Sequence, residues 1–207
     1  MPKINAPTID EHKELTRKSL LDAGADAFVR HGLASTSIGT LAHAAGIART
    51  TVYEYFPNKE SVLAALIDER LPPIVDRVLD DLPDDDPADR LAEIMRRSFK
   101  LVDDHPVETT LLFRVSRELP KPERDKAWSV FDRIRSEMIQ LCRRGIESGE
   151  FPNVNPRSLG TIVADHLIGG IDELFVRGAD AAELVVAARI SFFRHGLASG
   201  GLPTGCA

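Results

Sequence analysis

The segment from residue 46 to residue 60 reads GIARTTVYEYFPNKE and brings an arginine, two threonines and two tyrosines close together. On a helix, which turns by about 100° per residue, Val52 and Phe56 fall on one side. Thr50 and Tyr53 fall on the other side, where packing does not explain them. Hydroxyl, methyl and guanidinium groups can contact base edges and phosphates in a DNA major groove. The polar side of this helix is therefore a candidate DNA-reading surface.

A second short helix precedes this segment and is expected to position it. Residues 37–45 carry apolar side chains at helical spacing, and the pattern stops at a glycine. Because glycine readily adopts the left-handed conformation of a tight turn, the AGI sequence at 45–47 can join the two helices. The result is a helix-turn-helix, predicted at about residues 36–55. The helix starts near Ser37 and Lys59 are also suited to binding phosphate oxygens.

The whole chain is predicted to be all-α. It has 207 residues, of which 43% are hydrophobic, and apolar residues recur at helical spacing without alternating β-branched runs. Gly32 is expected to end the first helix, Asn58 to cap the fourth, and Pro72-Pro73 to break or kink it. Helices are expected at about residues 10–31, 37–45, 48–55, 58–71, 87–104, 106–119, 122–148, 156–177 and 181–196.

A loop divides the predicted helices into two groups. The stretch 80–89, DDLPDDDPAD, contains six aspartates and two prolines and is interpreted as solvated. We therefore predict a helix-turn-helix DNA-binding domain at residues 10–70, with its fourth helix as a link. A C-terminal helical domain is predicted at residues 71–200, and residues 201–207 are expected to form a flexible tail.

Composition argues against several classes of protein. The formal net charge is −6, with most of the negative excess beyond residue 70, so DNA binding would depend on a local basic patch. No apolar run approaches the roughly 20 residues of a membrane span, and without a visible export signal the expected location is the cytoplasm. Cys142 and Cys206 form no disulfide framework or metal-ligand set. No cofactor, metal site or catalytic set is predicted, and an enzyme is the weaker alternative.

Residues 17–67 resemble the DNA-binding segment of the TetR family of transcriptional regulators. The resemblance is carried by the stretch TSIGTLAHAAGIARTTVYEYFPNKESVL. Carried over position by position, the resemblance implies groove contacts from Arg49, Thr50, Thr51 and Tyr53 and phosphate contacts from Thr36, Ser37, Tyr55 and Lys59. The departures from the family pattern are Ala48 in place of the usual serine cap, Gly39 within the second helix, and Pro72-Pro73. Without the resemblance, half-buried helix residues are the alternative interpretation of the two tyrosines.

The resemblance also implies a homodimer that binds a pseudo-palindromic double-stranded DNA operator and acts as a repressor released by a small, largely apolar effector. The expected pocket lining is Phe99, Phe113, Trp128, Phe131 and His166, with a filled core as the alternative. Segments 156–177 and 181–197 are expected to form the dimer face, because the second is apolar nearly all round and Gly169-Gly170 would allow another backbone to approach. A constitutive or architectural DNA-binding protein without a ligand is the alternative function.

Overall fold

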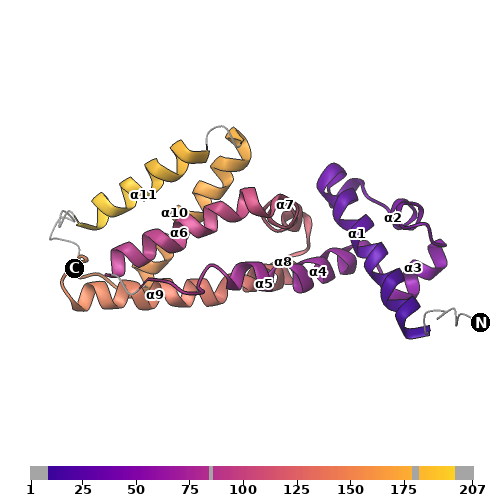
Figure 1. The fold of residues 1–207 in the computed structure, drawn as a ribbon, viewed down its shortest axis with the longest axis horizontal. Coiled ribbons are helices and arrows are strands. Elements are labelled where there is room, and N and C mark those ends of the chain that lie inside the picture. The colour runs from indigo at the N-terminus through magenta and orange to yellow at the C-terminus, as the bar shows by residue number, and fades with distance from the viewer. Residues whose placement is uncertain (1–8, 84–85, 179–181, 199–207) are drawn as a thin grey trace, which may run out of the picture. The chain divides into compact units, whose positions relative to one another are not determined.

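The computed structural model describes residues 9–83, 86–178 and 182–198. Within these ranges every regular element is a helix (Figure 1), which confirms the prediction of an all-α fold. In chain order the elements are α1 (Ile9–Ser35), α2 (Ile38–Ala45), α3 (Arg49–Tyr55), α4 (Lys59–Arg70), α5 (Pro72–Asp76), α6 (Pro87–Asp104), α7 (Pro106–Phe113), η1 (Val115–Glu118), α8 (Lys121–Trp128), η2 (Ser129–Phe131), α9 (Asp132–Glu147), α10 (Pro156–Arg177) and α11 (Ala182–Ala198), where η marks a 3-10 helix.

The described residues divide into two compact units. The first unit contains the residues up to Leu71 together with Val107–Trp128. The second unit contains Pro72–Pro106 together with the residues from Ser129 onward. The first unit therefore combines α1 to α4 with η1, α8 and nearly all of α7, which come from a later part of the sequence.

Helices α1 to α4 pack around an apolar core in the first unit. Its fully buried side chains include Leu20, Phe28, Leu41, Val52, Leu63 and Leu66. Helix α1 approaches α4 closely at Gly24, where a Cβ atom would lie 2.9 Å from Cγ1 of Val62. This packing gives α2 and α3 a fixed support, so the side of α3 that faces away from the core is held in a defined orientation.

Local capping explains where these helices begin and end. The Ser37 side chain accepts a hydrogen bond from the backbone N–H of Thr40 and caps α2, while Gly46 ends it with φ 68°. Asn58 and Ser61 form a reciprocal capping box at the start of α4. Helix α1 is interrupted at Gly32, where φ is 76° and ψ is 169°. The positions of Gly32, Ser37, Gly46 and Asn58 were predicted from the sequence, whereas the part that Ser61 plays was not.

The continuous helices predicted at 106–119 and 122–148 are wrong, because each is divided. The first is α7 followed by η1, and the Ser116 hydroxyl in η1 bonds to the backbone carbonyl of Leu112 and competes with regular helix geometry. The second is divided by η2 between Trp128 and Asp132. Because α8 belongs to the first unit and α9 to the second, this break coincides with a boundary between units.

In the second unit α10 packs against α6, α9 and α11 (Figure 1). The ring of Phe99 on α6 fills the space in front of Gly170, where a Cβ atom would lie 2.5 Å from Cε1 of the ring. At Gly169 a Cβ atom would lie 3.3 Å from Nη1 of Arg189. At Gly170 the Phe99 ring of the same chain therefore occupies the space that a second backbone was expected to approach, whereas at Gly169 that approach stays a prediction.

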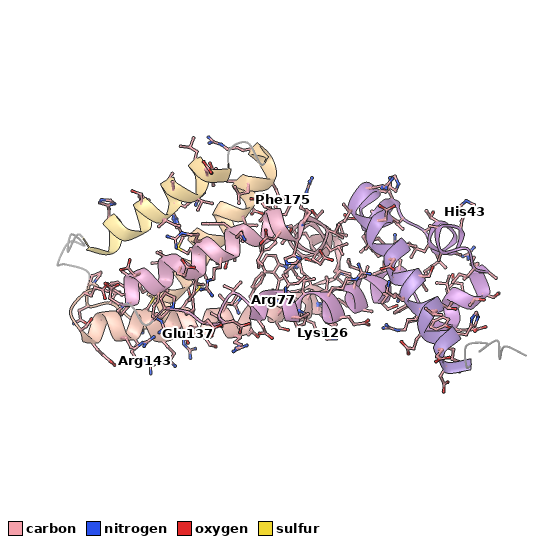
Figure 2. All side chains as sticks on the ribbon, viewed as in Figure 1. His43, Arg77, Lys126, Glu137, Arg143 and Phe175 are labelled. Atoms are coloured by element: carbon pink, nitrogen blue, oxygen red, sulfur yellow. The ribbon has the colours of Figure 1, made fainter. Side chains whose placement is uncertain are left out.

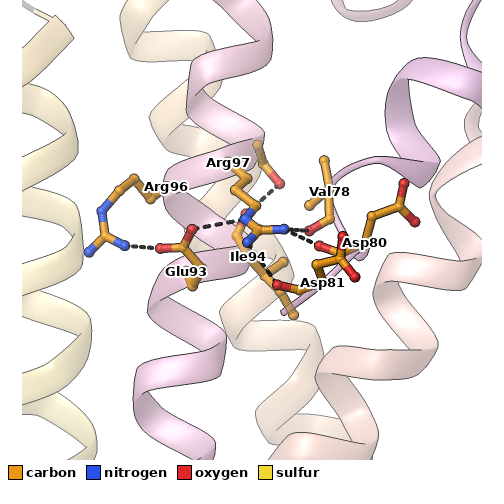
Figure 3. A network of polar contacts seen from close by, with 8 residues as sticks. Val78, Asp80, Asp81, Glu93, Ile94, Arg96 and Arg97 are labelled. Atoms are coloured by element: carbon orange, nitrogen blue, oxygen red, sulfur yellow. Dashed lines mark hydrogen bonds and ion pairs between the residues drawn. The ribbon is translucent and has the colours of Figure 1, made fainter. Parts of the chain in front are cut away.

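A polar network holds the segment that follows α5 against α6 (Figure 3). The guanidinium of Arg97 on α6 donates to the backbone carbonyls of Val78, Asp80 and Asp81 and to the carboxylate of Glu93. Asp81 has a φ of 47°, which leaves its carbonyl turned toward α6. One planar side chain thus satisfies several carbonyls of an irregular segment, which is what a guanidinium with its fork of donors can do.

Candidate nucleic-acid interface

Helix α3 presents one buried and one exposed side. Val52 is fully buried and Phe56, just beyond the helix, is 5% exposed. Tyr53 is 47% exposed, and Arg49 and Thr50 are exposed as well. The Arg49 guanidinium donates to the Tyr53 hydroxyl over 3.2 Å and lies 5.8 Å from the centre of its ring. The structure therefore brings two predicted groove-contacting residues together in a single pair on the exposed side.

Thr51 and Tyr55 lie at the border between these two sides. Both are half-buried. Ala48 precedes the helix and gives it no side-chain cap, so the backbone N–H groups of the first turn have no partner from that residue. Glu54 is exposed, and its carboxylate would repel a phosphate placed nearby.

The start of α2 supplies exposed hydroxyl groups. Ser37 and Thr40 are both exposed, and their hydroxyl oxygens lie 2.9 Å apart. Thr36 is different: it is only 2% exposed, and its hydroxyl donates to the carbonyl of Gly32 over 2.7 Å. The structure thus places the Thr36 side chain inside the protein, where its hydroxyl cannot reach a phosphate, and leaves Ser37 as the accessible member of the predicted pair.

Two exposed residues of α2 were missed by the sequence analysis. Thr40 shares its hydroxyl contact with Ser37, and the spacing of three residues between two hydroxyl residues at a helix start was the available signal. His43, labelled in Figure 2, is exposed in the last turn of α2. Both lie on the helix that precedes α3 and extend the candidate DNA-reading surface.

Lys59 at the start of α4 is already engaged within the protein. Its ammonium group donates to the carbonyls of Leu33 and Ala34, over 2.7 Å and 3.1 Å. An ammonium group carries three donors, so one remains for a phosphate. The predicted phosphate contact of Lys59 is therefore compatible with its place in the structure, and the same residue also holds the end of α1.

Charged groups on α1 and α4 brace the support beneath α3. The Arg17 guanidinium lies 5.4 Å from the ring centre of Phe56 and donates to both carboxylate oxygens of Glu69. These hydrogen bonds lower the pKa of the Glu69 carboxyl, although burial acts in the opposite direction. Arg70 donates to Asp22 over 2.5 Å in a second link between the same helices. The two links connect α1 to α4 on the surface while Val62 packs at Gly24 in the core.

The residues predicted to line an effector pocket are distributed over the two units. Phe113 and Trp128 belong to the first unit, where their rings pack edge to face with centres 5.2 Å apart. Phe99, Phe131 and His166 belong to the second unit. Phe99 is buried against Gly170, and His166 bonds to the backbone carbonyl of Arg189 and stacks on Phe192. Phe99 thus serves as a core residue in this conformation.

Two surface hollows occur elsewhere. One, of about 230 Å³, lies between α4 and α8 and is bordered by the Lys126–Asp68 ion pair; Lys126 is labelled in Figure 2. The other, of about 310 Å³, lies beside α9 and includes Arg133 and Glu137. Both have charged borders, and neither includes any of the five predicted pocket residues. They do not have the character of an enclosed apolar ligand site.

The described residues also limit the other classes of site. None of the helices in those ranges is long and apolar enough to cross a membrane. In the same ranges, no group of three or more histidine, cysteine, aspartate or glutamate residues is arranged to hold a metal ion. The surface with a clear chemical character is the exposed side of α2 and α3.

A polar reading helix held on a three-helix support defines a helix-turn-helix DNA-binding protein. Residues 20–66 match the model of bacterial regulatory proteins of the tetR family, and residues 84–169 match a tetracyclin repressor-like C-terminal domain. The chain belongs to the TetR family of transcriptional regulators.

Individual relatives agree with this assignment. The fatty acid metabolism regulator protein of Bacillus subtilis is 29% identical over 136 residues, which are 63% of this chain and 68% of the relative. The solved structure of Bacillus subtilis FadR with stearoyl-CoA has a TM-score of 0.72 at 19% identity and covers 88% of this chain and 98% of that one. The structure of AibR with isovaleryl coenzyme A and operator DNA has a TM-score of 0.69 at 17% identity, with coverages of 86% and 98%.

Proposed function

We propose that this protein is a homodimeric repressor that binds a pseudo-palindromic DNA operator and leaves it when a small effector binds. The observation that carries the proposal is the Arg49–Tyr53 pair, exposed on a helix whose opposite side is buried through Val52. The pair lies within the segment that matches the tetR family model. Arginine in this setting suits a guanine edge, and tyrosine suits a phosphate or a base.

The proposed phosphate contacts come from residues around this pair. Ser37, at the start of α2, is exposed, and the third donor of Lys59 remains available. Tyr55 is half-buried and retains some exposed surface. Contacts of this kind fix the position of the protein on the duplex but do not read its sequence. The proposed division is therefore between Arg49, Thr50 and Tyr53 for reading and Ser37, Tyr55 and Lys59 for anchoring.

The proposed dimer face consists of α10 and α11. Large apolar side chains on these helices are exposed in the single chain: Ile162, Val176, Leu184 and Phe192. Val185 and Ile190 of α11 are buried within the chain, so only part of that helix is left for a partner. The side chain of Phe193, which belongs to the predicted dimer segment 181–197, lies outside the described residues. Exposed apolar side chains gathered on adjacent helices are typical of an interface between subunits.

The proposed effector is a small molecule with a large apolar part, bound by the C-terminal helices. An acyl group carried on coenzyme A is the first class to test, because two similar structures contain stearoyl-CoA and isovaleryl coenzyme A. Another similar structure, of a regulator from Saccharomonospora viridis, contains choline, which supplies a cationic comparison compound. An effector can release DNA only if it binds the DNA-free conformation more tightly.

The test of the proposal combines two measurements on the purified protein. The first selects bound duplexes from a random-sequence library and measures their affinity against random DNA. A repressor of this class should select a site with two related half-sites. The second repeats the titration with acyl-CoA thioesters of different chain length and with choline. If a selected duplex is bound but no compound weakens the complex, the constitutive alternative holds; if no duplex is selected, the DNA-reading proposal fails.

A further inference from the structure

Residues 32–36, which comprise the last turn of α1 beyond the break at Gly32 and the link to α2, form the turn on which the start of α2 depends. Gly32 departs from helical geometry with a φ of 76°. The next helix, α2, is capped by Ser37. Within the turn, the Thr36 N–H donates to the carbonyl of Leu33, and the Thr36 hydroxyl donates to the carbonyl of Gly32. The position of Ser37 is therefore set by the conformation of residues 32–36.

Two charged side chains from other elements hold this turn. Lys59 of α4 donates to the carbonyls of Leu33 and Ala34. Glu118, the last residue of η1, accepts a hydrogen bond from the backbone N–H of Ala34 over 2.7 Å. The cation thus binds carbonyl oxygens while the carboxylate binds an N–H group. Each charge meets backbone groups of the opposite polarity, which is the arrangement that stabilises both.

Glycine suits the position beside the carboxylate for two reasons. A Cβ atom at Gly32 would lie 2.8 Å from Oε1 of Glu118, so the end of the glutamate side chain would have to move away from the turn. The φ of 76° is also one that side-chain-bearing residues rarely adopt. The missing side chain lets the carboxylate approach the turn closely enough to reach the Ala34 N–H. Glu118 and Gly32 therefore fit each other although they lie far apart in the sequence.

We propose that Glu118 is a positioning residue for DNA binding, whose carboxylate fixes the turn between α1 and α2 and so the placement of Ser37 and the helix-turn-helix. The inference rests on the proposed function. Glu118 lies outside residues 20–66, which match the DNA-binding family model, and inside residues 84–169, which match the C-terminal model. It comes from the segment 107–128, which joins α6 to α9 along the chain. Any change that withdraws this segment removes an acceptor from the turn.

The effect of removing the Glu118 carboxylate should be limited, because its hydrogen bond is exposed to solvent. The bond between Glu118 and Ala34 lies at the surface, where water can replace a lost partner. The turn also keeps the Lys59 bonds and the Thr36 bonds when Glu118 is changed. We therefore expect the loss of Glu118 to shift the conformation of the turn without unfolding the helices around it.

The experiment compares Glu118→Ala and Glu118→Gln with Glu123→Ala in the full-length protein. Glu123 is an exposed glutamate on α8 of the same unit, so its replacement controls for the loss of one negative charge. Affinity is measured for the duplex that the wild-type protein selects from a random library. Glu118→Ala should weaken binding about tenfold and Glu118→Gln, which retains an acceptor oxygen, about threefold. Glu123→Ala should bind as the wild type does.

A spectroscopic measurement separates positioning from a general loss of stability. The amide proton of Ala34 donates to a carboxylate in the wild type, so its NMR resonance should move upfield in Glu118→Gln, while the resonances of the α6 core remain in place. If Glu118→Ala does not fold, Glu118→Gln decides. Wild-type affinity in Glu118→Gln, or an unmoved Ala34 resonance, overturns the proposal. A wild-type protein that selects no duplex would instead overturn the proposed function itself.

Discussion

The guanidinium of Arg49 donates to the hydroxyl of Tyr53 over 3.2 Å while it lies 5.8 Å from the centre of the tyrosine ring. The two residues are one helical turn apart on α3, so their side chains meet on the same side. The contact restricts the rotamers of a long flexible side chain before DNA is present. A restricted arginine loses less entropy when it binds a base, and it approaches the base from a defined direction.

Removal of the tyrosine hydroxyl should therefore lower the ability to read one base pair. We expect Tyr53→Phe to reduce discrimination at the position that Arg49 contacts, and Tyr53→Ala or Thr50→Ala to weaken specific binding by about 1–3 kcal/mol. Thermal unfolding should be unchanged, since Tyr53 and Thr50 are exposed. Titrations against the selected duplex and single-base variants measure both effects. Wild-type affinity in Tyr53→Ala and Thr50→Ala would mean that α3 is not the reading helix.

Lys59 should act differently, because an ammonium group that contacts a phosphate reads no sequence. Lys59→Ala is expected to weaken binding to selected and random duplexes alike and to reduce the slope of log affinity against log salt by about 1. The matched control is Lys18→Ala, which removes an exposed lysine paired with Asp22 on α1. An unchanged salt slope in Lys59→Ala would show that Lys59 only holds the end of α1.

Helices α1 to α4 could be predicted because the residues that begin and end them act locally. Ser37, Gly46 and Asn58 act on neighbouring residues, and each one caps a helix where the sequence indicated. The burial of Thr36 could not be predicted in this way. Its hydroxyl bonds to Gly32 because the turn folds back on α1, and a threonine before a serine cap looks the same in the sequence whether it faces solvent or the core.

The contacts of the later helices depend on residues far apart in the chain. Glu118 and Ala34 are 84 positions apart, and no spacing rule connects them. The aromatic residues give a similar lesson: helical spacing marked Phe99, Phe113 and Trp128 as core or pocket, but it could not assign them to different units. The break at η2 was also invisible, since the stretches on both sides carry the pattern of one helix.

Gly170 provides a test of the core that supports α10. A Cβ atom there would lie 2.5 Å from the Phe99 ring, so Gly170→Ala is expected to destabilise the protein by about 1–3 kcal/mol through overpacking. Gly196→Ala on α11 is the control, because a Cβ atom at that position would meet nothing within 4 Å. There, the gain in helix propensity should leave stability equal or up to about 1 kcal/mol higher. Chemical denaturation measures both, and equal stability of the two variants would contradict the close packing at Phe99.

Cys142 should report on the opening of the same core. Burial raises the pKa of its thiol from 9.0 to about 11, because the thiolate is disfavoured away from water. The stability associated with the buried thiol is complete below pH 9.0 and is lost as the pH rises toward about 11. In a Cys206→Ser variant, iodoacetamide at about pH 8, below the ordinary pKa of a thiol, should therefore modify the folded protein only as fast as it opens. Rapid labelling of the native protein would show that Cys142 is accessible.

The exposed apolar side chains of α10 and α11 lead to a prediction about assembly. Leu184 is 67% exposed on α11, and a charge placed there would be buried if this face joins two subunits. Leu184→Glu should therefore shift the mass measured by light scattering at micromolar concentration from dimer to monomer, since an unpaired buried charge costs several kcal/mol. Gln140→Glu, which adds the same charge at an exposed position of α9, should remain dimeric. Operator affinity should fall when the dimer is lost, because a monomer contacts one half-site with one reading helix. The monomeric variant should still show a cooperative thermal unfolding transition. A wild-type protein that is monomeric, or a Leu184→Glu variant that stays dimeric, would place the interface elsewhere or remove it.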